Sequence, residues 1–92
     1  MIRVLVKYKV RKDKINLIKK AIKDFIQGIK KTEANTLYYT SYQFENKQKF
    51  IHLMTFKDEL SEEKHRKSQN TKKFVNVLYP NCEQEPIFYN LN

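Results

Sequence analysis

Two histidines are the residues of this chain best suited to proton transfer, because imidazole is the side chain that ordinarily titrates near neutral pH. His65 falls in a polar, helical stretch, where it could shuttle a proton or hydrogen-bond a ligand at a pocket mouth. His52 shares one face of an alternating segment with Phe50, Met54 and Phe56, and could line the same pocket. The alternatives are a partly exposed surface histidine at 65 and a hydrogen-bonded packing histidine at 52.

Hydroxyl groups form the second set of candidates. Tyr8, Tyr39 and Tyr42 lie in segments with strand character and could hydrogen-bond a ligand through their phenols, although strand tyrosines commonly serve packing. Ser41 and Ser68 have neither a glycine-rich elbow nor an Asp–His pattern around them. Nucleophilic catalysis by serine therefore has no support in the sequence.

The sequence offers little to hold a cofactor. Two histidines without cysteine or carboxylate at ligand spacing make a poor metal site, so we expect no metal. Gly28 is the only glycine, which argues against a phosphate-cradling loop for flavin or nucleotide. Cys82, the single cysteine, follows Pro80 in a predicted loop without an evident activating base, and we interpret it as structural or incidental. A lone cysteine indicates a reducing compartment, and we expect the cytoplasm.

Length and composition indicate one folded domain over residues 1–92. Hydrophobic residues make up 40% and charged residues 32%, values that fit a globular chain rather than a disordered one or a membrane span. Charge interrupts residues 1–7, so no signal peptide is predicted there. The net charge of +9 could attract nucleic acid, but the lysines fall mostly on predicted solvent faces, which favours a solvated surface.

Residue periodicity predicts strands and helices in alternation. Residues 2–10 alternate with period two, and residues 36–45 and 49–56 are predicted to pair as a hairpin about Asn46-Lys47. A final strand is predicted over residues 87–91, with Pro86 at its start.

Two helical segments separate these strands. Asp13 is a candidate cap for a helix over residues 14–31, whose apolar residues recur at three- and four-residue steps. From Asp58 a second helix is predicted, capped by Asp58 or Ser61 and broken within residues 66–70. Its second piece contains residues 74–79 and ends at Pro80.

The predicted order is therefore βαββαβ, which is typical of a ferredoxin-like α+β fold: a four-stranded antiparallel sheet with helices on one face. Leu5, Ile51 and Leu53 would lie on the other face, alternating against the helix-covered set. An apolar sheet face left open favours pairing, so we expect a homodimer through the sheet faces, forming a dimeric α+β barrel.

Four segments, in order along nearly the whole chain, carry a resemblance to a known family. The first strand runs into a polar turn at residues 11–13, and the stretch from Glu33 to Tyr39 is similar to a Glu-x-Gly-x-x-x-Tyr pattern. Phe56 ends the third strand where the family usually has Trp, and His65, Ser68 and Phe74 match a His-x-x-Ser run followed by an aromatic residue. The chain thereby resembles the antibiotic biosynthesis monooxygenase family of the dimeric α+β barrel superfamily.

The resemblance implies a pocket between sheet and helices that binds a flat aromatic molecule and oxidises it with O₂, often without metal or flavin. Asn35 stands for the usual Gly, and Met54 falls where many members carry a carboxylate. We expect a cofactor-independent monooxygenase acting on a small aromatic or quinol-type substrate. Its predicted catalytic residue is His65, and its predicted substrate-binding residues are Val6, Tyr8, Tyr39, His52, Met54 and Phe56.

Two other functions fit the same element order. One is a non-catalytic dimer that binds or senses a small ligand, because a fold does not fix a function. The other is an RNA-binding domain of the RRM type. Residues 48–54 lack the glycine or alanine of the RRM signature, and Leu5, Ile51 and Leu53 offer no stacking aromatic rings. The sequence thus argues against nucleic acid and for a second subunit on that face.

Overall fold

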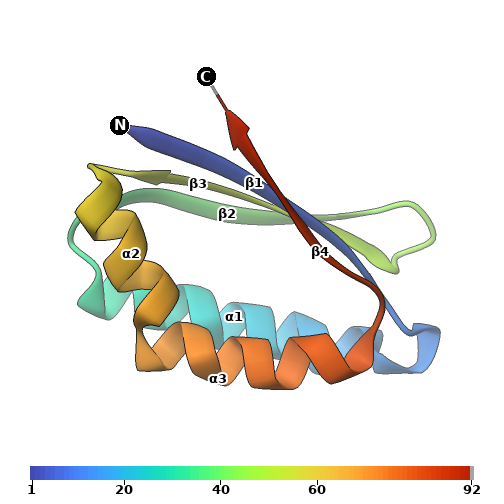
Figure 1. Ribbon diagram of the computed structural model, residues 1–92. Helices are drawn as coiled ribbons and strands as arrows, with labels where there is room; N and C mark the ends of the chain where they lie inside the picture. Colours follow the sequence, from blue (N-terminus) through green and yellow to red (C-terminus); the bar gives the residue numbers. More distant parts are fainter. Residues whose placement is uncertain (92) are drawn as a thin grey trace.

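The computed structural model describes residues 1–91, whose elements follow the predicted βαββαβ order with the second helix split (Figure 1). No helix in this range is long and apolar enough to cross a bilayer. The elements are β1 (Ile2–Val10), a 3-10 turn (Lys12–Lys14), α1 (Ile15–Thr32), β2 (Thr36–Phe44), β3 (Lys49–Phe56), α2 (Glu59–Lys67), α3 (Gln69–Leu78), a 3-10 turn (Tyr79–Asn81) and β4 (Cys82–Leu91).

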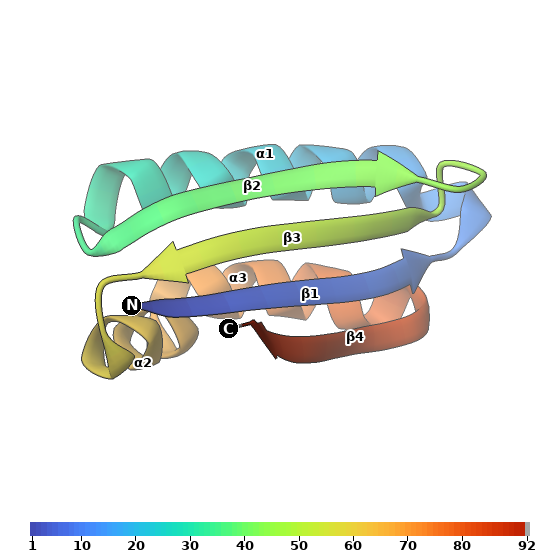
Figure 2. The same cartoon turned by 90° about the horizontal axis from the view of Figure 1, so that it is seen from above.

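The four strands form one antiparallel sheet in the order β2-β3-β1-β4. Figure 2 shows the strands side by side, with α1 and α3 behind them and α2 at one end. The helices therefore lie on one face of the sheet, which confirms the ferredoxin-like α+β fold predicted from the sequence.

The core lies between that face and the helices. Alternate residues of β1 and β3 point into it, as their period-two pattern predicts. The apolar stripe of α1 packs against them, since residues three and four apart share one side of a helix. The buried hydrophobic residues are Val4, Val6, Tyr8, Val10, Ile18, Ile22, Phe25, Ile29, Phe50, Met54, Phe56, Phe74 and Leu78.

The split of the second helix has a clear cause at Ser68. This residue has an extended backbone, and its hydroxyl accepts a hydrogen bond from the Thr71 backbone N–H at 3.1 Å, which caps α3. Asp58 caps α2 in the same way, accepting from the Ser61 N–H at 2.8 Å. The predicted break within 66–70 and the cap at Asp58 are thus confirmed.

The predicted cap at the start of the first helix is wrong. Asp13 lies inside the 3-10 turn Lys12–Lys14, and α1 begins after Lys14 without a side-chain cap. The chain tightens into a 3-10 turn before it becomes α-helical, so the carboxylate is one turn position too early to reach the free N–H groups.

The last strand is longer than predicted, because β4 begins at Cys82 rather than after Pro86. Cys82 is therefore the first residue of a strand and not part of a loop. Pro86 lies inside β4, where the register with β1 shifts between Lys7 and Lys9. An edge strand tolerates proline at such an irregularity, since no ladder hydrogen bond is lost there.

The face of the sheet away from the helices, here called the open face, carries apolar side chains interspersed with Arg3, Lys7, Lys9 and Lys49. No helix of residues 1–91 covers it (Figure 1). Leu5 pairs with Leu53 and Tyr89 across neighbouring strands, and Ile51 pairs with Tyr42, so these side chains share this face. Its most exposed apolar residues are Tyr38, Tyr42, Ile87, Tyr89 and Leu91, each at least 40% exposed.

Candidate functional site

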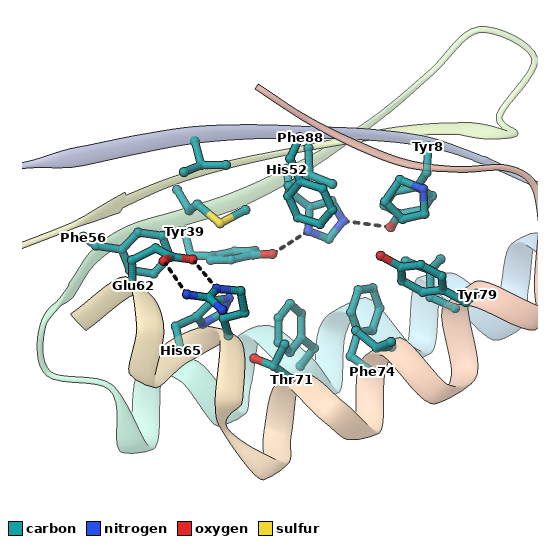
Figure 3. A pocket seen from close by; sticks show the side chains of 18 residues that line it. Tyr8, Tyr39, His52, Phe56, Glu62, His65, Thr71, Phe74, Tyr79 and Phe88 are labelled. Carbon is teal, nitrogen blue, oxygen red and sulfur yellow. Dashed lines mark hydrogen bonds and ion pairs between the residues drawn. The ribbon is translucent and has the colours of Figure 1, made fainter. Parts of the chain in front are cut away.

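A cavity of about 370 Å³ lies between the covered face of the sheet and the helices (Figure 3). Side chains from all four strands and all three helices line it, and most of the lining is hydrophobic. Concave, mainly apolar spaces with a few polar groups are the usual sites for small molecules. The aromatic residues of the lining are Tyr8, Phe25, Tyr39, Phe56, Phe74, Tyr79 and Phe88.

The predicted catalytic residue and all six predicted substrate-binding residues line this one cavity. Tyr42, the third tyrosine considered from the sequence, does not, because it lies on the open face and is 55% exposed. That these side chains bind substrate, or act on it, remains a prediction. The predicted residues that line the cavity are Val6, Tyr8, Tyr39, His52, Met54, Phe56 and His65.

His65 is buried in the cavity wall and is paired with a carboxylate. Its Nδ1 lies 2.7 Å from Oε1 of Glu33, an oxygen that also accepts a hydrogen bond from the Thr36 hydroxyl at 2.7 Å. The side chains of His65 and Glu33 are 8% and 12% exposed. When Nδ1 donates to the carboxylate, the tautomer is fixed and Nε2 keeps its lone pair for a ligand.

Aromatic rings surround the His65 imidazole. Its ring centre lies 5.1 Å from that of Phe56 and 5.7 Å from those of Phe25 and Tyr39. A hydrogen-bond acceptor in this position faces few competing polar groups, so its interactions are stronger than they would be in water.

The second histidine bridges two phenols. His52 Nδ1 lies 2.7 Å from the Tyr39 hydroxyl, and His52 Nε2 lies 2.8 Å from the Tyr8 hydroxyl. Burial lowers the pKa of His52 to about 3, and the neighbouring His65 acts in the same direction. Burial raises the pKa of both tyrosines. We call these residues the phenol–imidazole triad, whose members are neutral at physiological pH.

The register of the sheet brings this triad together. His52 lies directly opposite Val6 on β1 and Ser41 on β2. Tyr8 lies two residues after Val6, and Tyr39 lies two residues before Ser41. The two tyrosines therefore flank His52 on opposite sides along the strands, and each phenol reaches the imidazole diagonally on the covered face. Figure 3 shows the three side chains in a row along the sheet side of the cavity.

Charged groups occur only where the lining reaches solvent. Arg66 and Glu62 of α2 form an ion pair, with Nε and Oε2 3.1 Å apart, and the Arg66 side chain is 59% exposed. Phe88 of the edge strand β4 also lines the cavity and is 63% exposed. The cavity thus joins an apolar interior to a charged, open rim.

Glu33 is the site residue that sequence reasoning missed. It was part of the Glu-x-Gly-x-x-x-Tyr pattern, but nothing in the sequence connected it with His65. The one signal that could have found it is a carboxylate just after a helix, where the chain turns back toward the sheet. Phe25 falls in the apolar stripe predicted for the helix over residues 14–31, and Phe74 in the family pattern; neither was predicted to bind substrate, yet both line the cavity.

The donor set does not suit a metal. Within residues 1–91, no group of three or more His, Cys, Asp or Glu side chains is arranged to hold one. Burial and the nearby Glu85 raise the pKa of the Cys82 thiol to about 11, so the thiolate that would bind a metal is scarce at neutral pH.

Comparison with known proteins finds one family match and several solved structures that superimpose on nearly the whole chain. Residues 1–77 match the antibiotic biosynthesis monooxygenase family. A conserved protein from Methanosarcina mazei Go1 is 26% identical and superimposes with a TM-score of 0.89, over 99% of this chain and 90% of that one. A crystal structure of an antibiotic biosynthesis monooxygenase is 13% identical, with a TM-score of 0.89 over 100% and 97% of the two chains.

A third solved structure, of a protein from Mycobacterium tuberculosis, is 12% identical and has a TM-score of 0.89 over 99% of this chain and 92% of that one. No curated protein matches this sequence. At 12% and 13% identity, two of these likenesses establish the fold alone, whereas the family match covers most of the chain.

Proposed function

This chain belongs to the antibiotic biosynthesis monooxygenase family, and from that premise we propose that it is an enzyme that oxidises a small aromatic, quinol-type molecule with O₂. The reaction would take place in the cavity between sheet and helices. One observation carries this proposal: His65, in the wall of an aromatic cavity, is oriented by Glu33 so that Nε2 is free to accept a proton.

The size and lining of the cavity support a flat ligand. A volume of about 370 Å³ is near the lower end of the range for small-molecule sites, which suits one to three fused rings. Phe25 and Phe74 stack with ring centres 4.4 Å apart and planes 3° from parallel. Such rigid rings favour a planar, apolar partner over a flexible or charged one.

The proposed chemistry starts with the substrate hydroxyl. Its O–H bond breaks, the proton passes to His65 Nε2, and Glu33 stabilises the imidazolium through Nδ1–H. The electron-rich ring that remains is itself the reductant of O₂. One oxygen atom forms a C–O bond at a ring carbon in place of its C–H bond, the other leaves as water, and the quinol becomes a hydroxyquinone. The proposed reaction therefore requires neither metal nor flavin. The protein contributes a base, an orientation and a mainly apolar cavity.

Oxygen uptake tests this function. Purified protein would be given a panel of hydroquinones and dihydroxynaphthalenes, and the uncatalysed autoxidation would be subtracted. We expect His65→Ala to lower the catalysed rate about 100-fold or more, as loss of a general base does. Lys64→Ala changes an exposed neighbour on α2 and should leave the rate unchanged. Equal rates in the wild type and His65→Ala would remove His65 from the mechanism, and binding without uptake would indicate a ligand-binding protein.

We also propose that the open face pairs with a second copy of the chain. Leu5, Ile51 and Leu53 form its half-buried centre, and more exposed tyrosine, isoleucine and leucine side chains lie around them. Apolar side chains gathered on one face of a small protein favour association, because a partner removes them from water. The helices and the cavity would then lie on the outer sides of the dimer.

A further inference from the structure

The phenol–imidazole triad holds one more hydrogen than its internal hydrogen bonds use. Tyr8 and Tyr39 each carry one O–H, and a neutral imidazole carries one N–H. The two contacts within the triad, at 2.7 and 2.8 Å, use two of these three hydrogens. One phenolic O–H is therefore left over at any moment, and leaving such a group buried without an acceptor is unfavourable.

The tautomer of His52 decides which phenol keeps the spare hydrogen. If Nδ1 carries the hydrogen, it donates to Tyr39, Tyr8 donates to Nε2, and the Tyr39 O–H is free. If Nε2 carries it, Nε2 donates to Tyr8, whose O–H is then the spare hydrogen, while Tyr39 donates to Nδ1 and its oxygen is free to accept. Both phenols line the cavity, so the change of tautomer alters what the cavity offers to a ligand.

We propose that the phenol–imidazole triad recognises one ring oxygen of the ligand in both its carbonyl and its hydroxyl form. Tyr39 makes the contact, and His52 changes tautomer to match the oxygen. A carbonyl, which can only accept, selects the tautomer that leaves the Tyr39 O–H free to donate. A hydroxyl that donates to the Tyr39 oxygen is bound in the other tautomer.

Tyr39 is the phenol that faces the ligand because of its neighbours. Its ring centre lies 5.7 Å from that of His65 and 5.4 Å from that of Phe25, with the Phe25 ring nearly perpendicular. A ligand ring packed against this cluster would place one substituent oxygen beside Tyr39. This inference rests on the proposed function, since a quinol becomes a carbonyl compound when it is oxidised, and the same site must hold both forms.

Binding and the His52 tautomer can be measured without turnover. The probes are 1-naphthol, 1-tetralone and naphthalene, which are similar in size and carry a hydroxyl, a carbonyl or no oxygen. In protein labelled with ¹⁵N-histidine, the protonated and unprotonated ring nitrogens have distinct chemical shifts. We expect 1-tetralone to move His52 toward the Nδ1–H tautomer and 1-naphthol toward the Nε2–H tautomer.

Variants separate recognition from packing. Tyr39→Phe should weaken both oxygen-bearing probes at least tenfold and naphthalene hardly at all, whereas Tyr42→Phe, on the open face, should change nothing. If both probes leave His52 in the same tautomer in the wild type, the proposal is wrong whether or not the variants fold. If all three probes bind equally, the triad does not recognise the ligand oxygen and this proposal is wrong, although the cavity still binds aromatic molecules. If none binds, the proposed function fails together with it.

Discussion

His65 Nδ1 lies 2.7 Å from Glu33 Oε1, although the two residues are 32 positions apart in the sequence. Glu33 directly follows α1, and His65 lies in α2, which stands at the same end of the sheet (Figure 1). The carboxylate thus approaches the imidazole from behind the cavity wall and leaves the other ring nitrogen for a ligand. A residue at the end of α1 therefore orients the candidate catalytic residue of α2.

Replacing Glu33 by Gln tests this link. The amide can still accept from Nδ1–H, but it no longer stabilises a positive imidazolium, so we expect kcat to fall about 10- to 100-fold. Glu63→Gln, on α2, serves as the control. A kcat identical to that of the wild type would mean that Glu33 only packs.

His52 should make the fold sensitive to acid. Its pKa is about 3 in the folded state and 6.5 when exposed, so between these values the unfolded chain binds more protons and stability falls as pH falls. The slope from this group is about 1.4 kcal/mol per pH unit, or about 2 kcal/mol between pH 7 and pH 5.

Urea unfolding at several pH values measures this effect. The free energy of unfolding of His52→Gln should be lower than that of the wild type at pH 7, but its fall from pH 7 to pH 5 should be smaller by about 2 kcal/mol. Parallel pH dependences in the two proteins would show that His52 is not held neutral by the fold.

Gly28 provides a test of how α1 packs against α3. A methyl group at this position would collide with the side chain of Asn70, whose amide donates to the Phe25 carbonyl at 2.9 Å. Gly28→Ala alone should therefore lose this hydrogen bond, which offsets the gain of about 1 kcal/mol from higher helix propensity. In an Asn70→Ala background the same change should stabilise by about 1 kcal/mol. Additive effects in this double-mutant cycle, followed by thermal unfolding, would contradict the close contact.

Pairing through the open face predicts a native mass near twice 11.2 kDa by light scattering. Leu53→Lys places a charge at the centre of this face and should give a monomer that remains folded by circular dichroism. Leu17→Lys, on the outer side of α1, adds the same charge to a residue that is 47% exposed and should remain a dimer. If the wild-type protein is a monomer, the proposed pairing of two chains through the open face is wrong.

The sequence predicted β1 and β3 to the residue, because strict alternation leaves little choice of boundary. Asp13 and the start of β4 were wrong for a common reason: both depend on how the chain bends, at a 3-10 turn and at a register shift beside Pro86. Helix 14–31 was displaced by one residue from the observed α1, which is the usual uncertainty at a helix end.

The cavity residues were predicted because they alternate on one face or match a family pattern, yet their partners were not. His52 was expected to be a packing residue or a cavity residue, and its contacts with Tyr8 and Tyr39 depend on the register of three strands. Glu33 depends on where α2 stands relative to the end of α1. Such pairings arise from three-dimensional placement, which residue spacing along one chain does not encode directly.

We expect an aromatic ligand to lie against His65 inside the cavity, and intermolecular NOEs test this placement most directly. With 1-naphthol bound to ¹³C-labelled protein, we predict NOEs from the ligand ring protons to the ring protons of His65, Phe25 and Phe74. NOEs confined to the open face, for example to Tyr42 and Tyr89, would contradict the account, because the ligand would then occupy the surface assigned to the second subunit.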